Sequence, residues 1–229
     1  MDLQAIDEGA SFALHGIHKD GLNQLMEAAT HLGDRTVVIG VALGGVIALA
    51  LARKYGSASI ILVIAVASAI FIATIETVTL LGHGNAAIGV PVLGGLGFAV
   101  VRQSRSAFIL IMTAAAMLGL SEGTKELVHR KRPDLPNPVV AVPHTFSFPS
   151  GHSLGSAAIY MSLALLVARR LSSRSLGYSL IAVAFLLSVL IGFTRMYLCV
   201  HWFSDVLAGW SAGFGLAALS RWLDERWNP

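Results

Sequence analysis

Three short polar clusters lie in an otherwise apolar chain, and they combine the residue types needed to hold and attack a phosphate. The first runs from Lys125 to Pro133, the second is Pro149-Ser150-Gly151-His152, and the third contains Arg195, His201 and Asp205. Lysine and arginine can bind phosphate oxygens, while histidine can act as a nucleophile or as an acid. No dense set of aspartate and glutamate accompanies them, so we expect phosphoryl chemistry that uses neither a metal nor another cofactor.

In the third cluster, His201 and Asp205 are four residues apart, about one turn of a helix. At that spacing the carboxylate can accept a hydrogen bond from one ring nitrogen and leave the other nitrogen free to attack. Such a pair is more often a structural hydrogen bond than a catalytic one. Arg195 favours the catalytic interpretation, because a guanidinium can bind two phosphate oxygens at once.

The second cluster predicts the start of a helix that can bind an anion. Ser150 is a suitable N-cap residue, and Gly151 lets an anion approach the backbone. The free N–H groups and the positive end of the helix dipole then form a phosphate site. A simple capped helix start needs neither Gly151 nor His152, so His152 is the stronger sign of chemistry.

In the first cluster, Lys125 and Arg132 are seven residues apart and would share one face of a helix that ends at Pro133. Glu122, one turn earlier, can pair with Lys125. The alternative explanation is that these cations anchor the end of a helix at the membrane surface.

The composition indicates an integral membrane protein. Hydrophobic residues make up 55% of the chain and charged residues 13%, whereas a soluble domain averages about 25% charged residues. A spanning helix needs roughly 17 to 25 apolar residues. The candidates are residues 36–52, 58–81, 87–101, 107–128, 152–168, 176–196 and 203–220. The third is short and rich in glycine, so the predicted fold is an all-α bundle of six or seven transmembrane helices.

The distribution of lysine and arginine predicts which helix ends lie inside the cell. Basic residues follow the first, third, fifth and last candidate spans, whereas the turn at residues 82–85 has none. This alternation places all three clusters together on the outer side of the membrane. The basic residues of the first cluster break the rule there, which indicates that they bind an anion. Because topology explains most other cations, we expect no nucleic acid partner.

Residues 1–34 lack a cleavable signal-peptide pattern and carry an amphipathic stripe instead. Leu22, Leu25, Met26 and Ala29 follow the spacing of one helix face. We expect either an amphipathic helix at the membrane interface or a short helix packed over the bundle. The predicted division is an N-terminal interfacial segment of residues 1–34 and a transmembrane domain of residues 35–229.

The chain has one cysteine, Cys199, which excludes an intrachain disulfide. Cysteine and histidine do not cluster along the sequence in the spacing of a zinc-binding motif. We therefore expect no structural zinc site.

The order Lys-x6-Arg-Pro, Pro-Ser-Gly-His and Arg-x5-His-x3-Asp resembles the three signature motifs of the phosphatidic acid phosphatase type 2 superfamily. The resemblance covers residues 125–205, and the segment His31-Leu32-Gly33-Asp34 is similar to that of bacterial lipid phosphatases in this group. It implies that His201 is the nucleophile, that Asp205 orients it, and that His152 is the general acid. It also implies a phosphate-binding set: Lys125, Arg132, Ser150, Gly151 and Arg195.

Two positions depart from the family pattern. Thr194 stands where the third motif usually has serine, and Cys199 stands where a glycine commonly precedes Val-His. Threonine keeps the hydroxyl, so we expect phosphate binding to survive. Cys199 is small enough to pack but can alter the local backbone.

The resemblance implies a metal-independent membrane phosphatase that acts on a lipid phosphate or pyrophosphate through a phosphohistidine. Undecaprenyl pyrophosphate is favoured, because the chain is compact and has no extra soluble domain; phosphatidylglycerol phosphate and phosphatidic acid are close behind. The expected location is the bacterial inner (plasma) membrane, with the site on the extracytoplasmic face. The alternatives are a transporter, which Glu76 and Thr77 in the second span keep open, and a non-catalytic protein that binds lipid phosphates.

Overall fold

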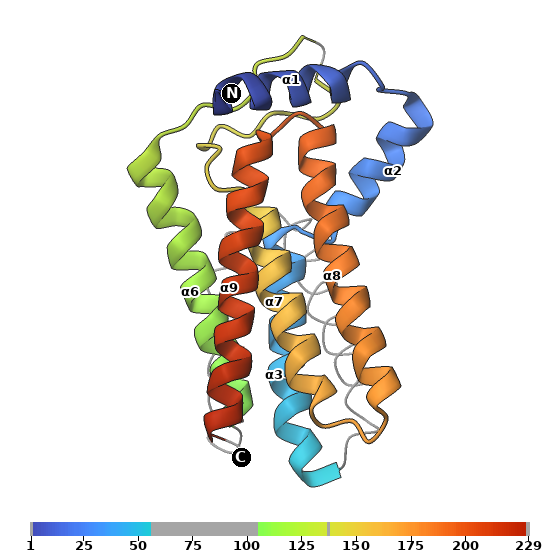
Figure 1. Ribbon diagram of the computed structural model, residues 1–229, viewed down its shortest axis with the longest axis vertical. Coiled ribbons are helices and arrows are strands. Elements are labelled where there is room, and N and C mark those ends of the chain that lie inside the picture. The colour runs from blue at the N-terminus through green and yellow to red at the C-terminus, as the bar shows by residue number, and fades with distance from the viewer. Residues whose placement is uncertain (1, 56–104, 137, 228–229) are drawn as a thin grey trace, which may run out of the picture.

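The computed structural model describes residues 2–55, 105–136 and 138–227, and within these ranges every regular element is a helix (Figure 1). The helices are α1 (Leu3–His15), α2 (Asp20–His31), α3 (Arg35–Tyr55), α6 (Arg105–Val128), α7 (Gly151–Ala168), α8 (Arg174–Tyr197) and α9 (Phe203–Trp227). The predicted spans at 58–81 and 87–101, the turn at 82–85, and Glu76 and Thr77 lie outside the described residues. Helices α6, α7 and α8 are long and apolar enough to cross a membrane. The all-α prediction is confirmed for the described residues.

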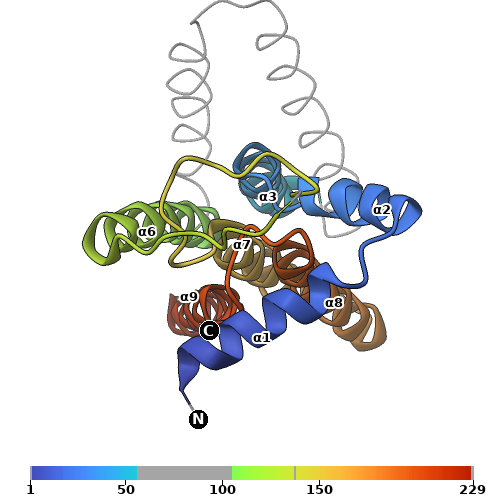
Figure 2. The ribbon, with the colours of Figure 1, turned by 90° about the horizontal axis from the view of Figure 1, so that it is seen from above.

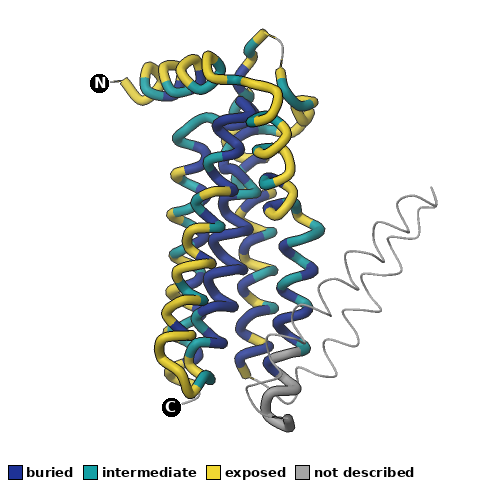
Figure 3. Tube along the Cα trace, turned by 90° about the vertical axis from the view of Figure 1, so that its right-hand side faces the viewer, coloured by how far each residue is buried: buried dark blue, intermediate teal, exposed yellow. Residues whose placement is uncertain are grey.

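Helix α7 is the centre of the bundle, with α3, α6, α8 and α9 around it (Figure 2). Most of its residues are buried, and Figure 3 shows that buried residues run through the middle of the bundle. Helix α9 lies close to α7: a Cβ added at Gly213 would lie only 2.6 Å from the Cβ of Ala157. A Cβ at Gly209 would lie 2.8 Å from the backbone oxygen of Ser150. These glycines let the start of α9 lie directly beside the start of α7.

Large apolar side chains cover the outer surface of the bundle. On α8 the exposed fractions are 62% for Val183 and 64% for Leu186, and on α6 they are 40% for Phe108 and 50% for Met112. A soluble monomer rarely exposes such a continuous apolar surface. Contact with lipid chains explains it, in agreement with the composition.

Four helix ends that carry the polar clusters meet at one end of the bundle. Helices α6 and α8 end there, whereas α7 and α9 begin there (Figure 1). The clusters are therefore neighbours in space, as the charge alternation predicts.

Helices α1 and α2 are tied to the same end. Helix α1 lies across the bundle and α2 runs beside α8 (Figures 1 and 2). Leu22 and Met26 pack against buried Tyr197 and Leu198, whereas Leu25 is 62% exposed. The predicted stripe thus contacts the bundle through part of its length. The position of this segment at a membrane interface, and the division at residue 34, stay predictions.

Buried ion pairs stabilise the opposite end of the bundle. Arg169 donates to Asp224 at 2.8 Å, and Arg170 lies 3.4 Å from the other carboxylate oxygen. Asp224 is 1% exposed. Arg169 and Arg170, which the sequence assigns to the inner side, therefore lie far from the three clusters.

Two helix boundaries differ from the predictions. Helix α6 ends at Val128 and not near Pro133, because His129 adopts a left-handed φ of 51° that a continuous helix does not allow. Lys125 and Arg132 therefore do not share a helix face. Helix α9 begins at Phe203, so His201 precedes the helix that carries Asp205.

Candidate active site

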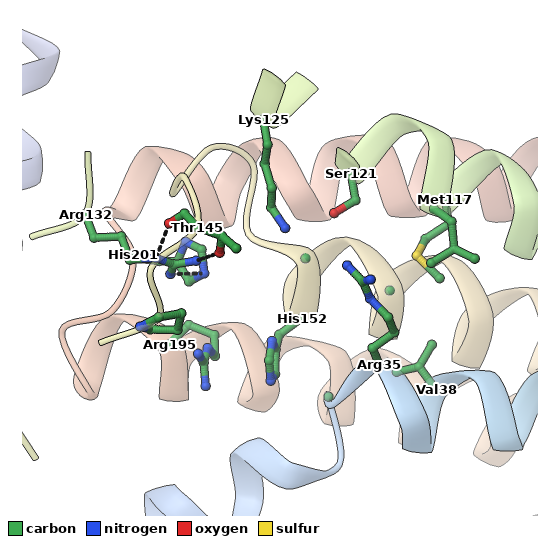
Figure 4. A pocket seen from close by; sticks show the side chains of 15 residues that line it. Arg35, Val38, Met117, Ser121, Lys125, Arg132, Thr145, His152, Arg195 and His201 are labelled. Carbon is green, nitrogen blue, oxygen red and sulfur yellow. Dashed lines mark hydrogen bonds between the residues drawn. The ribbon is translucent and has the colours of Figure 1, made fainter. Parts of the chain in front are cut away.

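A cavity of about 200 Å³ opens where the three clusters meet (Figure 4). Residues from α3, α6, α7 and α8 line it, together with the segments that follow α6 and α8. The predicted site residues in its wall are Lys125, Arg132, Gly151, His152, Arg195 and His201. Ser150 and Asp205 are fully buried behind the wall. The structure thus brings together predicted residues that are distant in the sequence: Lys125 and His201 are 76 positions apart.

His201 is 3% exposed and borders the cavity. Its Nε2 lies 3.0 Å from a guanidinium nitrogen of Arg132, and its Nδ1 lies 3.5 Å from Oδ2 of Asp205. Burial lowers the pKa of His201 to about 3, with the charges of Arg132 and Arg195 acting in the same direction and Asp205 against it. The imidazole is therefore neutral at pH 7, with an Nε2 lone pair that accepts from Arg132.

Asp205 is bound more closely by other groups than by His201. Its Oδ1 accepts a hydrogen bond from Arg130 at 2.6 Å, and its Oδ2 accepts the Trp202 N–H at 3.0 Å. Trp202 precedes α9 and Asp205 is the third residue of that helix, so the carboxylate also caps the helix start. The pairing that the sequence predicted within one helical turn is instead made across the start of α9.

Arg130 connects this carboxylate to α1. Its second terminal nitrogen donates to Asp7 at 2.6 Å, and Asp7 also accepts the Ser204 N–H at 2.9 Å. Burial opposes the charge of each partner, but their contact raises the pKa of Arg130 and, together with Ser204, lowers the pKa of Asp7. No motif or periodicity predicted a role for Asp7, which lies 123 residues before Arg130.

His152 has its own carboxylate partner, Asp34. Nε2 of His152 lies 2.8 Å from Oδ1 of Asp34, and the other carboxylate oxygen lies 2.8 Å from Nδ1 of His31. Burial raises the pKa of Asp34, but the hydrogen bonds from both histidines outweigh it and leave the pKa below its usual value. Gly33 permits this contact, since a Cβ there would lie 2.9 Å from Cδ2 of His152. Sequence spacing missed the pair; the one signal was the resemblance of the segment at residues 31–34.

Two cations reach the cavity from α6 and α3. Lys125 lies 3.5 Å from Glu122, as predicted, and Glu122 also pairs with Arg35. Arg35 lines the cavity and was not predicted. A Cβ at Gly151 would lie 3.3 Å from the Ser121 hydroxyl and 3.8 Å from Nζ of Lys125. Glycine therefore keeps the space between α7 and Lys125 open.

The remaining two arginines are held from behind. Arg132 donates to the backbone oxygens of Thr145 and Val200, each at 2.8 Å, and burial lowers its pKa. Arg195 donates to the Thr30 hydroxyl at 2.8 Å, whereas its buried Nε has no hydrogen-bond partner within the described ranges. A buried donor without a partner beside a cavity fits a bound anion.

Ser150 occupies the N-cap position of α7, but its side chain makes no capping bond. Its hydroxyl oxygen accepts from Ser153 at 3.0 Å, and its N–H donates to the backbone oxygen of Asp205 at 3.0 Å. Ser150 therefore joins α7 to α9. Its role in binding phosphate stays a prediction.

The two departures from the family pattern have clear surroundings. The buried Thr194 hydroxyl donates to the backbone oxygen of Ile191 at 2.6 Å and does not line the cavity. Cys199 adopts a φ of 54°, the left-handed region that glycine favours. Cys199 thus has the backbone conformation that a glycine at this position would favour.

The chain and its fold are similar to those of known proteins. A model of the PAP2 superfamily matches residues 106–229. Phosphatidylglycerophosphatase B of Bacillus subtilis (strain 168) is 38% identical over 108 residues, which are 47% of this chain and 52% of that protein. The match thus spans about half the length of this curated relative.

A solved structure is similar over a longer part of the chain. The crystal structure of a transmembrane PAP2 type phosphatidylglycerolphosphate phosphatase from Bacillus subtilis is 25% identical, with a TM-score of 0.64. The similarity covers 98% of this chain and 87% of that chain.

Proposed function

This chain belongs to the PAP2 superfamily, and from that premise we propose that it is an integral membrane phosphatase that hydrolyses a lipid phosphate. The observation that carries the proposal is the neutral, buried imidazole of His201, which borders a cavity that cations surround. Such a nitrogen is available to attack phosphorus, and the cations neutralise the charge of the transferred group.

In the proposed reaction, Nε2 of His201 attacks phosphorus in line with the bond to the lipid oxygen. The N–P bond forms as the P–O bond breaks, and His152, in its protonated form, donates a proton to the departing oxygen. Neutral His152 then removes a proton from water, whose oxygen attacks the phosphohistidine. Inorganic phosphate and neutral His201 are released.

The cations have a positioning and an electrostatic role. Substrate phosphate would replace Nε2 of His201 as the acceptor for Arg132, which frees the lone pair for attack. The buried Nε of Arg195 supplies a donor that has no partner in the described chain. Lys125, Arg35 and the start of α7 contribute positive potential from the other side. This set neutralises the phosphate without calling on a metal ion.

Asp34 and Asp205 orient the two histidines. A carboxylate 2.8 Å from His152 favours the imidazolium that an acid requires. Asp205, near Nδ1 of His201, favours the tautomer that keeps the proton on Nδ1 and the lone pair on Nε2.

The first substrate that we propose is phosphatidylglycerol phosphate, because both relatives are named for activity on that lipid. Undecaprenyl pyrophosphate, which the sequence favours, stays a prediction, as does phosphatidic acid. All three present a phosphate at the depth where the helix ends meet. We place the site on the extracytoplasmic face of the bacterial inner membrane, from the positions of the basic residues.

The proposal is tested by phosphate release in detergent with EDTA present, using the three lipids in parallel. His201→Gln should abolish release, whereas His144→Gln, a change at an exposed histidine, should leave it intact. Labelled substrate should yield an acid-labile phosphoenzyme in the wild type and none in His201→Gln. Equal release from His201→Gln and wild type, or no release from any lipid, would refute the proposed function.

A further inference from the structure

A second cluster of potential ligands lies at the same end of the bundle, outside the phosphate cavity. His15 is in the last turn of α1, His18 follows α1, and Cys199 is in the turn between α8 and α9. Each offers one ligand atom, and these atoms all lie within 4.8 Å of one another. None of the three residues lines the phosphate cavity. We propose that His15, His18 and Cys199 form a binding site for a divalent transition metal, with Zn²⁺ the best match.

The two imidazoles are oriented for this role. Nε2 of His18 lies 2.7 Å from the backbone oxygen of Tyr197. A carbonyl accepts, so this nitrogen carries the proton and Nδ1 keeps its lone pair. Metal-binding histidines commonly donate their other N–H to a carbonyl in this way. Nδ1 of His15 is buried without a hydrogen-bond partner in the described part of the chain, and a bound cation would explain that unsatisfied nitrogen.

The spacing suits a tetrahedral ion after a small closure of the side chains. With bonds of about 2.0–2.3 Å, tetrahedral zinc holds its ligands about 3.3–3.8 Å apart. Ligand atoms that lie up to 4.8 Å apart would therefore move together by about 1–1.5 Å when the ion binds. A cavity of about 300 Å³, lined by His15, Cys199 and Asp134, gives space for a fourth ligand such as water.

A metal ion and a proton compete for the sulfur of Cys199. Burial raises the pKa of Cys199 to about 11, so the free thiol is protonated at pH 7. Zinc binds the thiolate and releases that proton. The combination of thiolate and imidazole favours zinc over Mg²⁺ or Ca²⁺, which prefer oxygen ligands.

Occupation of the site would link α1 to the turn that precedes His201. The sequence does not reveal this cluster, because 181 residues separate His18 from Cys199. The prediction that the chain has no zinc site followed from spacing along the sequence. The fold brings the two histidines and the cysteine together. The proposed hydrolysis does not use this ion, so the two proposals can fail independently.

Cobalt titration tests the site directly. Tag-free protein in detergent, first stripped with EDTA and dialysed, is titrated with Co²⁺, which gives a thiolate-to-metal absorption band when cysteine is a ligand. We expect about one equivalent of bound Co²⁺ with this band, displaced by Zn²⁺, and a higher Tm when Zn²⁺ is added.

Two variants and one control make the result specific. Cys199→Gly keeps the left-handed backbone and should remove the band, and His15→Ala should weaken binding at least about 100-fold. His144→Ala, at an exposed histidine, should bind as the wild type does. Gel filtration of each variant confirms folding. Absence of the band in wild type, or equal binding by His15→Ala, would overturn the metal site and leave the phosphatase proposal intact.

Discussion

Replacement of Asp34 by asparagine tests whether a carboxylate from outside the three clusters serves His152. Asparagine preserves the shape of the side chain but removes the charge that favours the imidazolium. A hydrogen bond to a charged group contributes about 1.5–3 kcal/mol. The Asp34 side chain is 41% exposed, so screening by solvent argues for the lower part of that range, about 1.5–2 kcal/mol. At 1.36 kcal/mol for each factor of ten, kcat should fall about 10- to 30-fold.

The assay is the rate of phosphate release in detergent between pH 5 and pH 9, with kcat and KM measured separately. Asp34 does not line the cavity, so KM should change little. The alkaline limb of the kcat profile should move to lower pH, because the acid loses its proton more readily without the adjacent charge. Asp20→Asn, at an exposed position in the first turn of α2, is the matched control and should behave as the wild type does.

Asp34 also lies at the start of a helix, and this structural role must be distinguished from its proposed effect on His152. Asp34 precedes α3, and asparagine is as good at a helix N-terminus as aspartate, so the Tm should be nearly unchanged. If kcat stayed within twofold of wild type, or if it fell without movement of the alkaline limb, Asp34 would not support the acid. The pairing with His152 would then be a packing contact.

Three further predictions follow from the same geometry. Arg130→Lys should lower kcat about tenfold, because one ammonium cannot hold two carboxylates as a guanidinium does. When Arg130→Lys is combined with Asp7→Asn in a double-mutant cycle, the two losses of kcat should be less than additive. Gly151→Ala should raise KM severalfold at nearly constant kcat, because the methyl group would lie 3.8 Å from Nζ of Lys125; an unchanged KM would place the phosphate elsewhere. The pKa of His201 is about 3 in the folded protein and about 6.5 in the unfolded chain. The unfolded chain therefore binds a proton more readily, and acid favours unfolding. The free energy of unfolding should fall by about 2 kcal/mol between pH 7 and pH 5. The Tm of His201→Gln, which cannot titrate, should fall less over that interval.

The helices were predictable because their signal is local. An apolar run of sufficient length identifies a membrane helix, and α6, α7 and α8 lie within two residues of their predicted bounds. Helix α9 was predicted to stop at residue 220 but continues to Trp227. Its last turns are polar, so hydropathy could not show that Asp224 is buried against Arg169.

The site was predictable to the extent that the charged groups lie at helix ends. Alternation of basic segments places these ends on one side of a membrane, which is enough to bring Lys125, His152 and His201 together. The carboxylate partners were not predictable in this way. Asp34 and Asp7 reach the site through contacts across 118 and 123 residues, and no periodicity encodes such contacts. The left-handed φ of His129, which ends α6, is likewise not encoded by any periodicity.

The surroundings of the two histidines explain why the same side chain would take different roles. Asp34 lies 2.8 Å from His152, and its charge is available to stabilise an imidazolium. Asp205 lies 3.5 Å from His201 and is neutralised by Arg130 at 2.6 Å. A carboxylate that is already paired with a guanidinium can orient an imidazole but gives little support to a second positive charge. Arg130 thereby helps to keep His201 neutral and nucleophilic, while Asp34, which contacts His31 and His152, favours the imidazolium form of His152. This division of roles depends on environment and not on residue type.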